Sequence, residues 1–159
     1  MSKSLKRVRR ALEEAGIVTE PVEMAAETRT AQQAADAVGC RLDQIAKSIV
    51  FRGAESGRVR LFITAGGNRV DPERAASVAG EPLDAADAGF VRQMTGFVIG
   101  GVSPMGHLTP PSGYFDPRLL DFGEIWAAAG TPRHVFPIAP ADLLKVSGAQ
   151  LADFIQLPK

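Results

Sequence analysis

The residue with the clearest chemical potential is Lys47, which interrupts the apolar stretch "AKSIVF" at 46–51. If this stretch is a strand, Lys47 shares a face with Ile49 and Phe51 and lies at the rim of a buried surface. Burial penalises an ammonium group, so such a lysine needs a partner or has a lowered pKa. The alternative is a lysine at a strand end whose charged group reaches back to water.

A second candidate is the loop "GGVSPMGH" at 100–107, which follows the apolar run at 97–99. We expect residues 97–100 to form a buried strand and the loop to contribute little to the core. Gly100 and Gly101 allow a ligand to approach the main chain, and Pro104 stiffens the loop. Backbone N–H groups in a rigid loop can bind an oxyanion or a carbonyl without a charged side chain. The alternative is a tight turn that only connects two elements.

Other familiar chemistry has little support in the sequence. Ser103 lacks the G-x-S-x-G context of a hydrolase nucleophile, and neither His107 nor His134 stands at a spacing that indicates a triad. Cys40 and the two histidines lack metal-ligand spacing, so we expect no metal. The glycine motifs of dinucleotide and P-loop sites are absent from the sequence, and we expect no cofactor.

The elements that must position these residues are short and interleaved. The pattern favours a compact, mixed α/β (α+β) domain over the whole chain, 1–159, rather than a doubly wound sheet. A hairpin joins strands at 47–52 and 58–64. Helices are predicted at 4–15, 31–38, 72–79 and 83–94, a short strand with helix-like material at 114–130, a strand at 133–138, and one or two helices at 139–155.

Composition limits the function classes. The 18 basic and 18 acidic residues cancel, which argues against a general nucleic-acid binder. A single cysteine fits a reducing compartment, and no apolar run reaches the roughly 20 residues of a membrane span. No secretory signal is recognisable, so we expect a cytoplasmic protein. The first helix has a basic side, which is either a solvated face or a local phosphate-binding patch: Lys3, Lys6, Arg7, Arg9 and Arg10.

Several segments occur in an order typical of one known family. These are "AKSIVF", "AGGNRVD" at 65–71, "TGFVIGGVSPMGH" at 95–107, the aspartate of "GYFD" (Asp116) and "AAG" at 128–130. Over residues 20–155 or so, the chain resembles the YbaK/prolyl-tRNA-synthetase-associated editing domain family. The resemblance implies a small, strongly curved mixed β-sheet or barrel surrounded by helices.

The resemblance also implies an activity. Members of this family hydrolyse the ester between a wrong amino acid and a tRNA, most often tRNA(Pro), and many act in trans. The substrate would be tRNA(Pro) carrying alanine, cysteine or another small residue, with prolyl-tRNA synthetase as a possible partner and no membrane involved. One alternative is a non-catalytic module of the same fold that binds a nucleotide or an RNA end. Another is a serine hydrolase of small esters that uses Ser103.

The expected site follows residue by residue from the resemblance. Lys47 corresponds to the essential lysine, and Gly100 to Pro104 correspond to a Gly-x-x-x-Pro loop. One branch of the family has a Gly-Ala-Asn segment before a histidine, whereas this chain has "GTPRHVF" at 130–136. The catalytic residues would be Lys47, Gly100 and Gly101, and the substrate-binding residues would be Val102, Ser103, Pro104, Met105, His107, Asp116 and His134.

Overall fold

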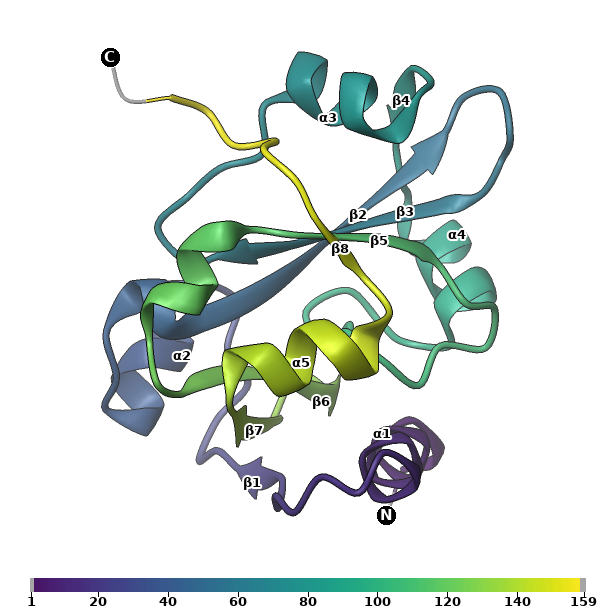
Figure 1. The fold of residues 1–159 in the computed structure, drawn as a ribbon. Coiled ribbons are helices and arrows are strands. Elements are labelled where there is room, and N and C mark those ends of the chain that lie inside the picture. The colour runs from purple at the N-terminus through teal and green to yellow at the C-terminus, as the bar shows by residue number, and fades with distance from the viewer. Residues whose placement is uncertain (1, 158–159) are drawn as a thin grey trace.

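An eight-stranded mixed sheet organises the protein, which we analysed as a computed structural model describing residues 2–157 (Figure 1). Its hydrogen-bonded order is β1-β7-β6-β2-β3-β5-β8, and β4 pairs with the far end of β2. The sheet is curved but open, not a closed barrel. The strands are β1 (Val22–Glu23), β2 (Ile45–Gly53), β3 (Val59–Ala65), β4 (Leu83–Ala85), β5 (Ser112–Phe115), β6 (Ile125–Thr131), β7 (His134–Ile138) and β8 (Gln150–Leu151).

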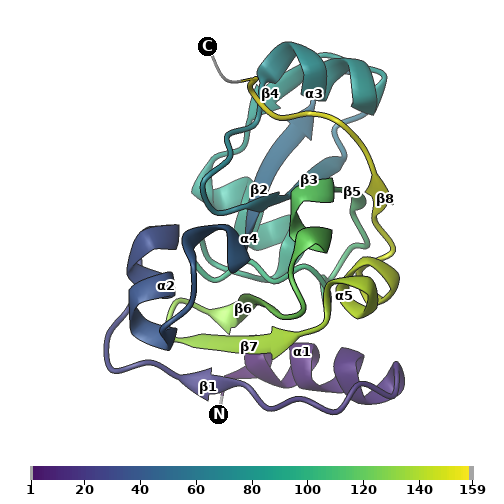
Figure 2. The ribbon, with the colours of Figure 1, turned by 60° about the vertical axis from the view of Figure 1, so that its left-hand side comes forward.

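Helices surround this sheet, as the two ribbon views show (Figures 1 and 2). They are α1 (Lys3–Glu14), α2 (Ala31–Val38), α3 (Pro72–Ala79), α4 (Ala88–Thr95) and α5 (Pro140–Ser147), with short 3-10 turns η1 (Leu42–Gln44) and η2 (Pro117–Asp121). Thr30, Asp71 and Asp87 each cap a helix by accepting a backbone N–H bond at its first turn. No helix in residues 2–157 is long and apolar enough to cross a membrane.

The central strand, β2, has an interrupted edge. It pairs along its length with β3. On its other edge it pairs with β6 only through Ile45 and Ala46, and with β4 only from Phe51 to Gly53. Within the described chain, residues 47–50 therefore have no strand partner on that edge. Lys47, the candidate site residue from the sequence, lies at the start of this gap.

The core has two main parts, one on each face of the central hairpin. The larger includes Leu5, Val8 and Leu12 of α1, which pack against the β6 side of the sheet. The smaller is an aromatic cluster around Phe62, whose ring centroid lies 4.9 Å from that of Tyr114. Ile49 and Phe51 pack against the aromatic cluster and Val50 against the larger core. Both faces of β2 are thus covered. A polar side chain on either face therefore needs a hydrogen-bond partner or an adjoining cavity, because burial without one costs free energy.

Residues 97–100 do not form the predicted strand. Phe97 is buried, but Val98 and Ile99 are 42% and 60% exposed, and the Gly101 N–H closes a turn on the Val98 carbonyl. The expectation that the loop adds little to the core is also wrong, because residues 101–105 are all buried. The chain leaves α4 through the left-handed Gly96 and reverses direction at the following turn. The apolar run is therefore too short to pair with another strand.

Other local predictions were partly wrong. Residues 83–94 are not one helix, because β4 precedes the Asp87 cap of α4. In 114–130, only η2 is helical and 125–131 is a strand, since pairing with β2 and β7 overrides the helix propensity of its alanines. One closing helix, α5, forms. The hairpin, the strand near 133–138 and the helices at 4–15, 31–38 and 72–79 are confirmed to within a residue or two.

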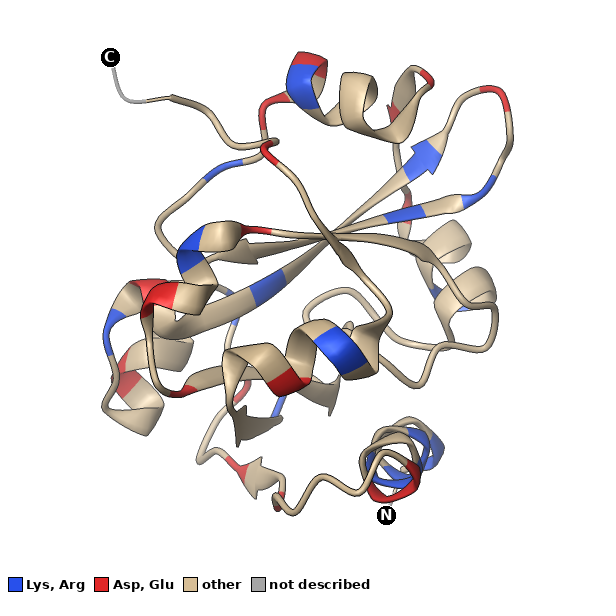
Figure 3. Ribbon diagram, in the orientation of Figure 1, with Lys and Arg blue, Asp and Glu red and all other residues tan. Residues whose placement is uncertain are grey.

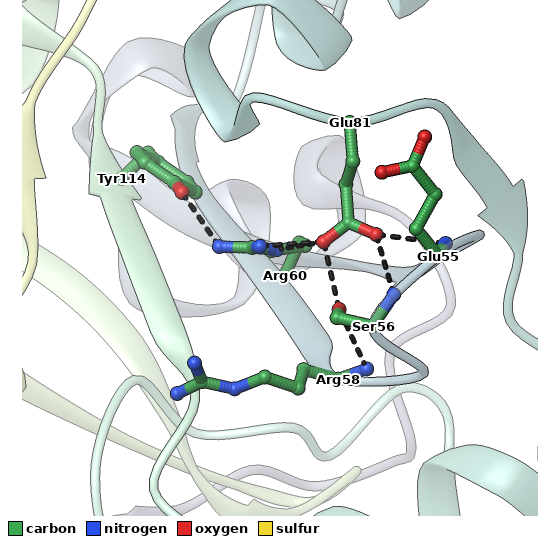
Figure 4. A network of polar contacts seen from close by, with 6 residues as sticks. All are labelled: Glu55, Ser56, Arg58, Arg60, Glu81 and Tyr114. Carbon is green, nitrogen blue, oxygen red and sulfur yellow. Dashed lines mark hydrogen bonds and ion pairs between the residues drawn. The ribbon is translucent and has the colours of Figure 1, made fainter.

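A carboxylate fixes the tip of the β2–β3 hairpin (Figure 4). Glu81 accepts hydrogen bonds from the backbone N–H groups of Glu55 and Ser56, both at 2.9 Å, and from the Ser56 hydroxyl at 2.7 Å. It also pairs with Arg60, which donates to the Tyr114 hydroxyl. The Ser56 backbone bond, followed by the Arg60 and Ser56 side-chain bonds, lowers the pKa of Glu81 from 4.5 to about 2. The ionised form is therefore the one that the folded hairpin stabilises.

This network predicts a specific acid sensitivity. Because the folded pKa lies below the unfolded one, the stabilisation by Glu81 is present above pH 4.5 and is lost as the pH falls towards about 2. Glu81→Gln should be less stable than wild type at neutral pH and lose less stability across this acidic window. Thermal midpoints between pH 7 and pH 2.5 measure both effects, with Glu73→Gln on the exposed side of α3 as the control. Parallel curves for Glu81→Gln and wild type would contradict the assignment.

Candidate functional site

A cavity of about 290 Å³ lies beside the interrupted edge of β2. Its walls come from the segment before α2, the start of β2, the turn at residues 99–102, and β6 with the turn that leads to β7. The volume is at the small end for ligand sites, and the walls are mostly apolar with a few polar groups. Apolar side chains on the walls include Met24, Ala34, Ile45, Val102, Trp126 and Val135.

Lys47 lies in the wall of this cavity. Its side chain is half-buried, and its ammonium group donates to the Gly66 carbonyl oxygen at 3.2 Å. Burial lowers the pKa of Lys47 from its ordinary 10.5, and the positive charge of Arg69 lowers it further. Asp43 and Asp116 act in the opposite direction. Of the two expectations for a buried lysine, a partner or a lowered pKa, both apply to Lys47: its ammonium group has a main-chain partner, and burial lowers its pKa.

Asp116 holds the turn behind Lys47. The carboxylate is 1% exposed and accepts from the Ala65 N–H at 3.1 Å and the Asn68 side-chain amide at 2.9 Å. Those two residues flank Gly66, whose carbonyl receives the Lys47 ammonium. Asp116 therefore positions Lys47 through the turn and does not line the cavity.

The same turn explains the two glycines of "AGGN". A Cβ on Gly66 would overlap the Leu42 carbonyl oxygen, and one on Gly67 would overlap the Asp43 carboxylate. Asp43 accepts from the Gly67 N–H at 2.8 Å and from the Arg118 guanidinium at 3.1 Å. At Gly66 the obstacle is backbone, so only glycine allows the turn to approach η1 this closely, whereas at Gly67 a side chain would displace the Asp43 carboxylate from its hydrogen bond.

The glycine loop divides its residues between the cavity and its support. Gly100 is exposed, has a left-handed φ of 93° and lines the cavity with Val102. Gly101 is buried behind them, where a Cβ would lie 2.7 Å from the Thr131 carbonyl carbon and 3.0 Å from the Pro132 nitrogen. Gly101 thus allows the loop to pack directly on the β6–β7 turn.

Four of the predicted substrate-binding residues belong to the inner part of the loop and do not line the cavity. Pro104 and Met105 are buried, and Met105 belongs to the larger core. The Ser103 hydroxyl is buried, 3.2 Å from the Met105 sulfur, and accepts from the Met105 N–H. His107 donates from Nε2 to the Ser103 carbonyl at 2.6 Å, and burial lowers the pKa of its ring.

Helix α1 supports this buried part of the loop. The Arg7 guanidinium donates to the carbonyls of Gly96 at 2.7 Å and Gly106 at 3.1 Å, and it lies over the Phe97 ring. Arg9 pairs with Glu20 at 3.0 Å. Most charged positions of α1 are basic, as Figure 3 shows, but these two are engaged within the protein. Of the two alternatives for the basic side of this helix, a solvated face does not describe Arg7 and Arg9.

His134 lies on the other side of the β6–β7 turn. Its Nδ1 is 2.6 Å from the Thr131 hydroxyl, and the ring faces a separate open depression that also includes Arg9 and Arg133. Thr131 and Pro132 line both this depression and the cavity, so they form the wall between the two. The structure does not bring His134 to Lys47.

Of the sequence-predicted site, the structure brings Lys47, Gly100 and Val102 to one cavity. The sequence analysis missed Ser48, the 28–30 segment and Trp126, which also line it. A serine inside an apolar strand was a visible signal for Ser48. Neither Trp126 nor residues 28–30 carry a sequence pattern that indicates a cavity.

The fold and site define a small mixed α/β domain with a lysine in the wall of an apolar cavity. The model of the aminoacyl-tRNA editing domain family matches residues 25–146. The chain belongs to this family, and the resemblance drawn from the sequence is confirmed.

Three relatives illustrate the similarity. An uncharacterized protein, YwhH of Bacillus subtilis (strain 168), is 31% identical over 144 residues, covering 91% of each chain. A crystal structure of a candidate trans-editing enzyme for prolyl tRNA synthetase is 47% identical, with a TM-score of 0.91 and 99% coverage of each chain. A scaffold protein from computational epitope grafting is 43% identical, with a TM-score of 0.90, covering 99% of this chain and all of its own.

The packing of Gly101 predicts that Gly101→Ala will be destabilising. The new methyl group meets backbone atoms of Thr131 and Pro132, which cannot move aside as a flexible side chain would. We expect a loss of about 1–3 kcal/mol in the free energy of unfolding, measured by urea titration. Gly123→Ala is the matched control, because its Cβ would meet nothing within 4 Å. Equal stabilities for the two variants would show that the loop does not depend on this contact.

Proposed function

We propose that this protein deacylates mischarged aminoacyl-tRNA in trans, with tRNA(Pro) carrying a small non-cognate amino acid such as alanine or cysteine as substrate. The observation that carries the proposal is the half-buried Lys47 in the wall of a cavity of about 290 Å³. This volume is at the small end for ligand sites and accommodates a small acyl group. Family membership and the candidate trans-editing relative support the same reading.

The chemistry required is modest because an aminoacyl ester is already activated. Water adds to the ester carbonyl, the carbon–oxygen bond to the ribose breaks, and the ribose oxygen leaves with a proton that came from the water. Negative charge develops on the carbonyl oxygen during the addition. The Lys47 ammonium and the backbone N–H groups of the turn at Gly100 are the donors that stabilise this charge.

The cavity walls supply selectivity. Three alanines, Ala34, Ala127 and Ala128, form part of a wall that also contains Ile45 and Val102. A small aliphatic side chain fits against these groups, and a larger one meets them. Binding alone separates side chains that differ by one methylene by only about 1–3 kcal/mol, which is why a second hydrolytic step is useful to a synthetase. Under this proposal, prolyl-tRNA synthetase supplies the substrate in the cytoplasm.

A panel of acylated tRNA(Pro) tests the activity. We expect rapid release of one small non-cognate residue among alanine, cysteine, 2-aminobutyrate and serine, and retention of proline. Lys47→Ala should lower this rate by about a hundredfold or more, because it removes the charged donor. Lys145→Ala, on the exposed side of α5, is the control. Full activity in Lys47→Ala would remove Lys47 from the mechanism, and tRNA binding without release would favour the non-catalytic binding module.

The lowered pKa of Lys47 predicts a pH dependence. If the ammonium form is the active one, kcat, corrected for spontaneous hydrolysis, falls at a pH below the ordinary lysine value of 10.5. Arg69→Gln removes a positive charge that lowers this pKa, so the fall should move to higher pH. Rates at saturating tRNA from pH 6 to just above the ordinary lysine value of 10.5 measure the shift. A fall that stays in place or moves to lower pH would contradict the assignment to Lys47.

A further inference from the structure

The Ser48 hydroxyl is a buried polar atom with no hydrogen-bond partner in residues 2–157. Ser48 follows Lys47 on β2 and lines the same cavity. Buried side-chain oxygens are nearly always hydrogen-bonded, and exceptions call for an explanation such as a catalytic role or a bound water or ion. No role has been assigned above to this hydroxyl.

The backbone of Ser48 also faces the interrupted edge of β2. Ser48 lies opposite Ile63 in the antiparallel β2–β3 ladder. The Ile63 carbonyl accepts from the Asp116 N–H, so the polar groups of Ile63 point towards β5 and away from Ser48. By the alternation of antiparallel ladders, the N–H and C=O of Ser48 then point to the opposite edge. The β6 ladder has already ended there, at Ala46.

Few side-chain oxygens that line the cavity remain without a partner. No Asp or Glu is among the described residues that line it. The Thr30 hydroxyl accepts from the Gln33 N–H as the cap of α2. The Thr131 hydroxyl bonds to His134 and accepts from the Arg133 N–H. Of the two hydroxyls left, Thr28 lies before α2, and only Ser48 adjoins Lys47 and is buried without a partner.

We infer that Ser48 hydrogen-bonds the α-amino group of the aminoacyl ester, an inference that rests on the proposed deacylase function. With the ester carbonyl towards Lys47 and the side chain against the apolar wall, the amino group is the polar group still needing a partner. A neutral oxygen suits it, because the nearby Lys47 charge favours the uncharged amine. Ser48 thereby distinguishes an aminoacyl ester from a simple acyl ester of the same size.

Stable analogues test this inference without turnover. The probes are 3'-(alanylamino)adenosine, an amide that resists hydrolysis, and 3'-(propionylamino)adenosine, which lacks only the amino group. We expect Ser48→Ala to weaken binding of the alanyl probe by about three- to tenfold, the effect of one hydrogen bond, and to leave the propionyl probe unchanged. Ser77→Ala, outside the cavity on α3, should change neither. Equal weakening of both probes by Ser48→Ala, or of neither, overturns the inference.

Thermal stability gives a second readout that a structural role would not produce. Removing an unsatisfied buried hydroxyl should leave the midpoint of Ser48→Ala equal to or above that of wild type. A lower midpoint would show that the hydroxyl has a partner inside the protein and would overturn the inference. Absence of tRNA deacylation by wild type, with preference for the alanyl probe intact and dependent on Ser48, would reject the proposed function and retain amine recognition.

Discussion

The site depends on an ammonium group that is half-buried and held by a main-chain carbonyl instead of a carboxylate. Two carboxylates lie near Lys47, those of Asp43 and Asp116. Each accepts a hydrogen bond from a backbone N–H group of the turn at residues 65–68. A direct ion pair would raise the pKa of the lysine and offset its positive charge with a neighbouring negative one. By binding the turn, the acids hold Lys47 in place, and within residues 2–157 the ammonium group has no carboxylate partner. The close approach of Gly66 and Gly67 to η1 is what makes this arrangement possible.

The second structural condition is the gap in the sheet. Had β6 paired with β2 beyond Ala46, its backbone would occupy the edge that now faces the cavity. The glycine loop closes the space from the other side, with Gly101 packed on the β6–β7 turn and Arg7 of α1 holding both ends of the loop. The cavity therefore exists because β6 stops pairing with β2 at Ala46 and the turn at Gly100 and Gly101 closes the space from the other side.

The sequence predicted the parts of the fold that have local causes. Helix caps such as Thr30 and Asp71, and the alternation of apolar and polar residues in the hairpin, depend on only a few neighbouring residues. The strand at 125–131 depends on distant partners, so propensity alone gave the wrong structure. The turn at 98–101 was missed because the apolar run resembles a strand, although Gly96 and the Gly101 N–H reverse the chain locally. Lys47 was visible as a charge among apolar residues. Ser48 was visible only as a serine inside an apolar strand, and the sequence does not reveal that its hydroxyl is buried without a hydrogen-bond partner.

The walls of the cavity have a consequence for folding. They come from four segments, near residues 24–34, 45–49, 99–102 and 126–135, that are distant in sequence. Contacts of such separation form only after long loops have closed, which makes them late and slow to appear. No fragment shorter than residues 24–135 contains all four segments, so a bound ligand reports that these distant segments have assembled. Ligand binding should in turn protect all four segments together against amide hydrogen exchange.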